Sequence, residues 1–383
     1  MIEDSNIFHG RIAIQQRVLA KYRVGFFDSL AKACENGLGV FAGDVYQEES
    51  IPTAERLQIA EYFKLRNIHF LTTESPYYLL WQAGLIDKLR EWNPDVLIVE
   101  ANPRYLSTDR GIRWMKRRGR AVIGWGLGAP PIARPPAWFG GKFADRRIRS
   151  RRMFIQQLDG LIAYSHRGAA EYLSIAKPNQ KVFVATNAVA SRPSGQFSQR
   201  PPEFEARARV LYVGRLQSRK RIDNLIRACS ALPDKLQPML WIVGDGPARR
   251  SLEELANRIF PAAEFPGSKF GAELEMFFSK ADLFVLPGTG GLAVQQAMAH
   301  GLPVIVAEGD GTQEDLVKAN NGWLIPADDE AGLRNALQEA LSDPERLRIM
   351  GGRSYKVVQE EVNVDQMVKV FVQAVKSIGG DIS

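Results

Sequence analysis

The sequence has few of the residues that build disulfide frameworks or metal clusters, and it has no long apolar run. Its 383 residues include four histidines and two cysteines, Cys34 and Cys229. Cysteines so far apart in sequence form neither a disulfide framework nor a zinc site, which favours a reducing, cytoplasmic location. No run approaches the roughly 20 apolar residues that cross a bilayer, and the start, MIEDSNIFHGR, lacks the apolar core of a signal peptide. There is also no Asp-x-Asp motif. We therefore expect a cytoplasmic protein with no bound metal.

What is present is the composition of a globular protein with excess positive charge. Hydrophobic residues make up 45% of the chain, and its length allows about two or three domains with substantial cores. The formal net charge is +7 and the sequence pI is near 9.3. This balance indicates an anionic partner.

Apolar runs of strand length alternate with helix-length segments in the first half of the chain. The expected strands are 11–19, 38–42, 96–100, 120–124, 161–165 and 182–185. This alternation predicts a doubly wound α/β domain, in which ligands collect at the carboxyl ends of the strands. Glu100, Asn102, Trp125 and Asn187 are therefore candidate cleft residues, and a loop or capping role is the alternative for each.

A second α/β series follows a segment that breaks every periodicity. Residues 191–205, SRPSGQFSQRPPEFE, are rich in Pro, Ser and Gly and are typical of a linker. The strands expected after it are 210–213, 239–243, 283–286, 304–306 and 323–325, with helices between them and at 330–342 and 343–354. The segment 364–378 is too apolar for a free tail, so we expect it to pack on a domain.

The stretch 283–307 predicts a strand, a glycine turn, a helix and a second strand. Pro287 ends the first strand, and Gly288, Gly290 and Gly291 surround Thr289 before helix-forming residues begin at 292. Free N–H groups and the positive end of a helix dipole suit a phosphate or diphosphate. A tight connection that binds no ligand is the alternative.

The segment 113–152 combines basic and aromatic residues. Its basic members include Lys116, Arg117, Arg118, Arg146, Arg147, Arg149, Arg151 and Arg152. The aromatic residues within it and just beyond it are Trp114, Trp138, Phe139, Phe143 and Phe154. This composition favours an anionic membrane or a phosphorylated carrier, and a solvated helix face is the alternative. We expect no nucleic acid, since no binding module accompanies the charge.

Five motifs in the second half resemble, in order, the donor domain of the family-four retaining glycosyltransferases (glycosyltransferases group 1). They are VGRL at 213–216 with Lys220 five residues after Arg215, GDGP at 244–247, FPG at 265–267, AMAHGLPVI at 297–305 and NGWLI at 321–325. The first half adds its layout and QRVLAKYR at 16–23, which resembles an acceptor-side opening loop and contains Arg23.

The resemblance implies the GT-B fold, an α/β architecture of two Rossmann-like domains that face a cleft. It places an acceptor-binding domain at 1–190, the linker at 191–205, a nucleotide-sugar-binding domain at 206–360, and a last helix, 361–383, that crosses back to the first domain. The implied acceptor-side residues are Arg23, Glu100, Asn102 and Trp125.

The resemblance also implies a reaction, the transfer of a sugar from a UDP or GDP sugar with retention at the anomeric carbon. The acceptor would be a saccharide or a lipid-linked molecule used in cell-surface polysaccharide or glycolipid synthesis. Negative charge grows on the leaving diphosphate, and the family stabilises it with cations and helix N-termini, without metal or another cofactor. Arg215 and Lys220 occupy the positions of those cations. The implied nucleotide-sugar contacts are Gly214, Gly244, Gly288, Thr289, Gly290, Gly291, Leu292, Gln296 and Glu314.

The sequence departs from the family at two glutamates that lie eight residues apart. Gly288 and Gln296 occupy those positions. Gln296 keeps hydrogen-bonding capacity for a ribose but loses charge assistance, and Asp310, Glu314 or Asp315 could supply a carboxylate instead. The family's histidine near the transferred sugar has no clear match. A nucleotide-sugar epimerase of the same fold and a non-catalytic binding protein are the alternatives.

Overall fold

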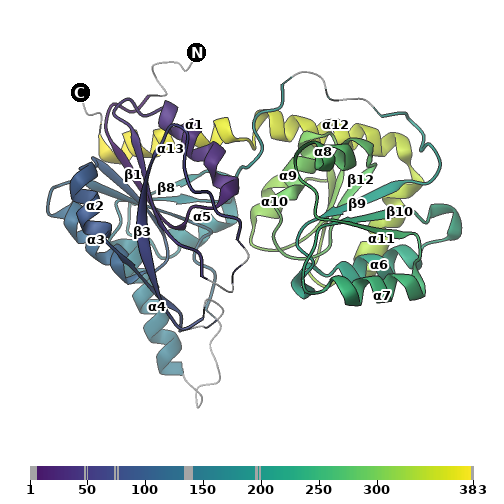
Figure 1. Cartoon of the computed structure of the whole chain (residues 1–383), viewed down its shortest axis with the longest axis horizontal. Helices are drawn as coiled ribbons and strands as arrows, with labels where there is room; N and C mark the ends of the chain where they lie inside the picture. The colour runs from purple at the N-terminus through teal and green to yellow at the C-terminus, as the bar shows by residue number, and fades with distance from the viewer. Residues whose placement is uncertain are drawn as a thin grey trace. The chain divides into compact units, whose positions relative to one another are not determined.

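The chain folds as two compact units, which the computed structural model in Figure 1 shows. Unit 1 comprises Met1–Asn187 and Val364–Ser383, and unit 2 comprises Ala188–Asn363. The structure describes residues 7–46, 49, 51–72, 75, 77–132, 141–194, 197 and 200–380, with the backbone alone at 141–143.

Unit 1 is built on an eight-stranded sheet with the order β4-β3-β2-β1-β5-β6-β7-β8. Its strands are β1 (Ile12–Val18), β2 (Leu38–Gly43), β3 (Glu61–Phe70), β4 (Leu79–Ala83), β5 (Val96–Glu100), β6 (Ala121–Gly126), β7 (Gly160–Ala163) and β8 (Lys181–Val184). Only β3 and β4 pair antiparallel among the described neighbours. The central strands are buried on both faces, which explains their continuous apolar runs.

Helices cover both faces of this sheet. They are α1 (Val24–Lys32), α2 (Leu85–Trp92), α3 (Leu106–Lys116), α4 (Gly141–Gln156), α5 (His166–Leu173) and α13 (Val364–Gly379), and a 3-10 turn, η2, spans Lys21–Arg23. Figure 1 shows α13 beside α1 on one face, where Phe371 meets Phe26 with ring centroids 4.9 Å apart. The apolar last segment therefore packs on the first unit, as the sequence predicts.

Unit 2 is built on a six-stranded sheet with the order β11-β10-β9-β12-β13-β14, and all its pairs are parallel. Its strands are β9 (Arg209–Val213), β10 (Met239–Val243), β11 (Ala263–Gly267), β12 (Leu283–Leu286), β13 (Val304–Ala307) and β14 (Gly322–Ile325). Its α-helices are α6 (Ile222–Ser230), α7 (Arg249–Ile259), α8 (Gly271–Lys280), α9 (Ala293–Ala299), α10 (Thr312–Leu316), α11 (Glu330–Ser342) and α12 (Pro344–Glu360), and its 3-10 turns are η3 (Ser218–Lys220) and η4 (Asp234–Leu236).

In each sheet the strand order brings together the loops that follow two neighbouring central strands. In unit 1 the sheet grows one way from β1 and the other way from β5, and in unit 2 it does so from β9 and β12. Ligands of open α/β sheets bind beyond the carboxyl ends of the strands at such switch points. The loops after these four strands are therefore where a site is expected in each unit. No helix in the described part of the chain is both long and apolar enough to cross a bilayer.

Candidate functional site

The loops after β9 and β10 are held together by backbone contacts that need glycine. The Gly214 N–H donates to the Val243 carbonyl at 3.0 Å, and the Leu216 N–H donates to the Asp245 carbonyl at 2.9 Å. A Cβ at Gly244 would lie 1.9 Å from the Gly214 carbonyl oxygen, so no larger residue fits this approach. Gly214 and Gly244 thus shape the floor of the site beside Arg215, whose side chain is exposed.

Lys220 joins the loop after β9 to the loop after β12. It ends η3, is 8% exposed, and its Nζ donates to the Thr289 carbonyl at 2.7 Å. The structure thus brings together two of the predicted residues that lie 69 positions apart in sequence. An ammonium held at a switch point beside a glycine loop can bind an anion there.

The Lys220 ammonium is in an environment that opposes its charge. Burial, together with the neighbouring Arg219 guanidinium, lowers its pKa to about 8, while Asp310 acts in the opposite direction. Arg219 also contacts the glycine loop, since its Nη1 donates to Thr289 Oγ1 at 3.3 Å and its carbonyl accepts from the Thr289 N–H at 3.2 Å. The sequence analysis missed Arg219, although the run Arg219-Lys220-Arg221 signals it.

Gly288 has no room for a side chain. Its backbone is buried, and a Cβ would lie 2.5 Å from both the Arg219 carbonyl oxygen and the Lys220 carbonyl carbon. Gly290 and Gly291 have φ angles of 71° and 122°, which favour glycine, and Leu292 is the N-cap of α9 without a side-chain capping bond. The backbone of this loop therefore leaves no space at position 288 for the glutamate that the family has there.

The predicted ribose-binding groups differ in position. Gln296 is exposed on α9. Glu314 is half-buried on α10, and its carbonyl accepts from Lys318 Nζ at 2.7 Å. Asp310 precedes α10, accepts from the Thr312 N–H and hydroxyl, and is the carboxylate that raises the pKa of Lys220.

In unit 1, Glu100 ends β5 at the switch point and is tied to β1. Its Oε1 accepts from the Arg17 N–H at 2.6 Å, and it also accepts from the Tyr105 hydroxyl. Burial raises the pKa of Glu100, while these two hydrogen bonds act in the opposite direction. Asn102 shapes the following loop, because its Oδ1 accepts from the Arg104 N–H at 3.2 Å. The sequence analysis did not identify Arg17 or Tyr105.

Arg23, which the resemblance places on the acceptor side, is buried in unit 1. It is 4% exposed, and its guanidinium lies 4.6 Å from the Trp125 ring centroid and 5.4 Å from that of Tyr164. Its Nη2 donates to the Tyr164 hydroxyl at 3.2 Å. Trp125 is 1% exposed and packs against Phe371, so both residues belong chiefly to the core beneath the site.

A cavity of about 1170 Å³ lies above these residues, entirely within unit 1. Glu100, Asn102 and Trp125 line it together with residues of the loop after β6 and of α4. No histidine is among its described lining residues: His166 begins α5, whose N-cap is Ser165, and the Ser165 Oγ accepts from the Gly168 N–H at 3.0 Å.

The segment 113–152 was predicted to form a basic and aromatic surface. Among its described side chains, basic residues are exposed and the predicted aromatic residues are buried. Trp114 and Phe154 are 8% and 5% exposed and belong to the core, since they face the sheet from α3 and α4. Trp138 and Phe139 lie outside the described residues, as does the side chain of Phe143. The arginines of α4 are mostly exposed.

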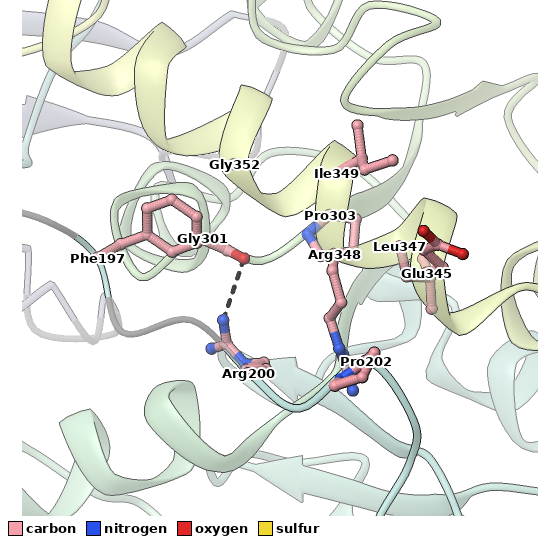
Figure 2. Close-up of a pocket in the computed structure, with 10 residues that line it drawn as sticks. All are labelled: Phe197, Arg200, Pro202, Gly301, Pro303, Glu345, Leu347, Arg348, Ile349 and Gly352. Atoms are coloured by element: carbon pink, nitrogen blue, oxygen red, sulfur yellow. Dashed lines mark hydrogen bonds between the residues drawn. The ribbon is translucent and has the colours of Figure 1, made fainter.

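The predicted linker is anchored on unit 2 by Arg200. Its guanidinium donates to the carbonyls of Phe278, Ala281, His300 and Gly301 at 2.7 to 3.1 Å. It thereby caps the C-terminal ends of α8 and α9. Figure 2 shows it beside a hollow of about 400 Å³ that is also lined by Phe197 and Arg348. Burial lowers the pKa of Arg200 to about 10, helped by Arg348.

Comparison with known proteins shows what unit 2 is similar to. Residues 195–357 match the family model "Glycosyl transferases group 1". The lipopolysaccharide core biosynthesis glycosyltransferase LpsE of Rhizobium meliloti is 22% identical over 77% of this chain and 90% of its own length. A GDP-mannose-dependent alpha-mannosyltransferase of Mycolicibacterium smegmatis is 33% identical, but the match covers 43% of each chain.

The fold is similar along nearly the whole chain. The structure of Anabaena HepE in complex with UDP superposes with a TM-score of 0.68 at 15% identity, covering 96% of this chain and 99% of that one. The chain therefore has the GT-B fold, and the match to the glycosyl transferases group 1 model lies within its second unit.

Proposed function

We propose that the protein transfers a sugar from a UDP or GDP sugar to a saccharide or lipid-linked acceptor, with retention and without metal. The observation that carries this proposal is the contact of the Lys220 ammonium with the Thr289 carbonyl at the switch point of unit 2. Similar proteins are named as a lipopolysaccharide core glycosyltransferase and a GDP-mannose-dependent transferase, and one is solved with UDP. These names support cell-surface polysaccharide synthesis and a nucleoside diphosphate donor.

In the proposed reaction the loop site stabilises the leaving diphosphate. Lys220 is buried, so its ammonium group interacts more strongly with a growing negative charge than the ammonium group of an exposed lysine does. Arg215 is exposed beside Gly214 and can clamp two phosphate oxygens with its planar fork. Arg219 adds a third cation at Thr289. Three such cations can take the role that a divalent metal has in other transferases.

The first test removes these cations one at a time. Arg215→Ala and Lys220→Ala should each reduce transfer from a nucleotide sugar by about two to three orders of magnitude, the scale of losing one preorganised charge partner. Arg250→Ala is the matched control, because Arg250 is exposed on α7 and pairs there with Glu254. EDTA should leave the parent rate unchanged. Parent-like rates in both variants would contradict the assignment.

The same assay separates the alternatives. An epimerase would convert the donor sugar without an acceptor, and a binding protein would retain nucleotide without turnover. The chemistry of epimerisation needs an acid and a base in the cleft. No histidine is among the described residues that line the cavity of unit 1, which favours transfer over epimerisation.

A further inference from the structure

The cavity of unit 1 is lined by far more positive than negative charge. Its charged lining residues are Arg104, Arg146, Arg147, Arg151 and Glu100. These residues come from two places, the loop after β5 and the helix α4, so their charges converge on one space of about 1170 Å³. Nothing in the sequence predicts this convergence, because residues 104 and 146 to 151 belong to separate segments.

Glu100, the one carboxylate among the described lining residues, is already engaged. Glu100 accepts hydrogen bonds from the Arg17 N–H and from Tyr105. Arg146 and Arg147 form no ion pair with any residue that the structure describes. The positive charge of the lining is therefore not neutralised from within the cavity.

The arginines are also close enough to repel one another. Burial lowers the pKa of Arg151, and Arg147 and Arg104 lower it further, while Glu171 only partly offsets this. Arg151 is held in place by a hydrogen bond from its Nη1 to the Pro130 carbonyl at 2.5 Å. A protein gains nothing in stability from like charges gathered around a hollow, so their arrangement indicates an anionic ligand.

We propose that this cavity binds a phosphoryl group carried by the sugar acceptor, with Arg147 and Arg151 as its main ligands. The proposal rests on the proposed glycosyl transfer and names the class of acceptor. Guanidinium groups bind phosphate oxygens in pairs, and a phosphate or diphosphate carries enough charge to engage several of them, whereas one carboxylate needs a single arginine.

The uncharged lining fits the rest of such a molecule. Tyr77, Leu79 and Leu127 line the cavity and are 67%, 36% and 46% exposed. Exposed aromatic and aliphatic surface beside an arginine cluster suits a sugar ring or an isoprenoid chain next to its phosphate. A free sugar phosphate and a lipid-linked sugar diphosphate share this chemistry.

The test measures binding to the full chain without nucleotide, by calorimetry at low salt. The probes are glucose 1-phosphate, glucose linked to a ten-carbon isoprenoid diphosphate, and methyl glucoside as the neutral comparison. The variant is Arg147→Gln/Arg151→Gln, and the matched control is Arg149→Gln/Arg152→Gln. The control removes the same charge from exposed positions of α4 that do not line the cavity.

We expect the variant to bind the phosphorylated probes at least tenfold more weakly and the control to bind within about twofold of the parent. Arg147→Gln alone should show part of the loss, and it leaves the Arg151 bond to Pro130 intact. Binding of both phosphorylated probes would indicate a free sugar phosphate, and binding of the isoprenoid probe alone would indicate a lipid-linked acceptor. Either result supports the proposal.

Three results would overturn it: equal losses in the variant and the control, equal affinity for methyl glucoside, or no binding of either phosphorylated probe by the parent. Donor turnover is measured separately with a nucleotide sugar. A chain that turns over the donor but ignores the phosphorylated probes disproves only the cavity proposal. One that binds the probes through Arg147 and Arg151 but never turns over a donor disproves the proposed transfer.

Discussion

At the scale of the residue, the candidate site of unit 2 depends on Lys220, whose ammonium group is buried although burial disfavours its charge. The motif that contains Lys220 could be predicted from the sequence. The protonation of Lys220 could not, because it depends on burial and on Arg219 and Asp310, whose positions come from packing. The same limit applies to Arg23, whose place under the Trp125 ring depends on residues more than a hundred positions away.

This lysine predicts a pH dependence. Its pKa is lowered to about 8, and only the protonated form stabilises a diphosphate, so kcat/KM should fall as pH rises through about 8. Arg219→Gln removes a group that lowers the pKa, so the fall should move to higher pH. Arg227→Gln, an exposed change on α6, should leave the profile unchanged. A profile that is flat to pH 10 would contradict the role of Lys220.

The same shift affects stability in a defined direction. Because the pKa is lower in the folded chain than the ordinary 10.5, the fold disfavours the charged form. Below pH 8 this penalty is constant. Between about pH 8 and 10.5 the lysine is neutral when folded and charged when unfolded, so its contribution to stability becomes more favourable as pH rises.

At the scale of the element, the place of the glycine loop between β12 and α9 could be predicted from the sequence. The course of its backbone and the contacts that it makes could not. Its strand, breaker and helix composition identify it in the sequence. Gly288 lies against the backbone of residues 219 and 220, which belong to the η3 turn and are distant in sequence. Because this contact is not visible in the sequence, the glycine at position 288 reads there as a simple replacement of glutamate.

Restoring the family's two glutamates should therefore have opposite results. Gly288→Glu places a Cβ 2.5 Å from backbone atoms, which must move, so we expect a lower thermal midpoint and about a tenfold or greater loss of nucleotide affinity. Gln296→Glu lies on an exposed face of α9 and should keep the midpoint. If it reaches a ribose, charge assistance of about 1 kcal/mol should tighten nucleotide binding roughly fivefold.

Calorimetric titration with UDP and GDP, together with thermal unfolding, separates these effects. Gly288→Ala is the control for backbone crowding, because it adds the Cβ without charge. A Gly288→Glu chain that unfolds and binds like the parent would show that the loop can adopt the family's path.

The strands themselves were unevenly predictable. Buried strands such as β5, β12 and β13 stand out as apolar runs, because they are covered on both faces. The expected strands omit β3, β4 and β11, whose residues are mostly exposed or half-buried, so burial does not select one continuous apolar run in them.

At the scale of the whole molecule, the GT-B architecture could be predicted because five separate motifs in unit 2 follow one another in the family's order. Unit 1 offered only a layout, so its cavity and the placement of its arginines came from the structure. The apolar surface of the last segment predicted that α13 is covered, and the resemblance predicted that it packs on unit 1.

The net charge of +7 raises the question of whether the molecule associates with anionic membranes. Burial of Trp114 and Phe154 removes two of the aromatic anchors that the sequence suggested, and among the side chains that the structure describes the exposed arginines of α4 are a remaining contact surface. Each contributes about 1 kcal/mol near an anionic surface. Binding should therefore be reversible and should decline as the Debye length shrinks from about 10 Å at 0.1 M salt to about 3 Å at 1 M.

Co-sedimentation with phosphatidylserine-containing vesicles tests this, and Arg149→Glu/Arg152→Glu is the informative variant because neither residue lines the cavity. We expect the parent to pellet with anionic vesicles at low salt and the variant to stay in the supernatant. Neutral vesicles should retain neither. Equal pelleting of parent and variant would mean that α4 is not the contact surface. If the parent fails to pellet at 0.05 M salt, the acceptor meets this protein in solution, and the phosphoryl group proposed for the cavity then belongs to a soluble sugar phosphate.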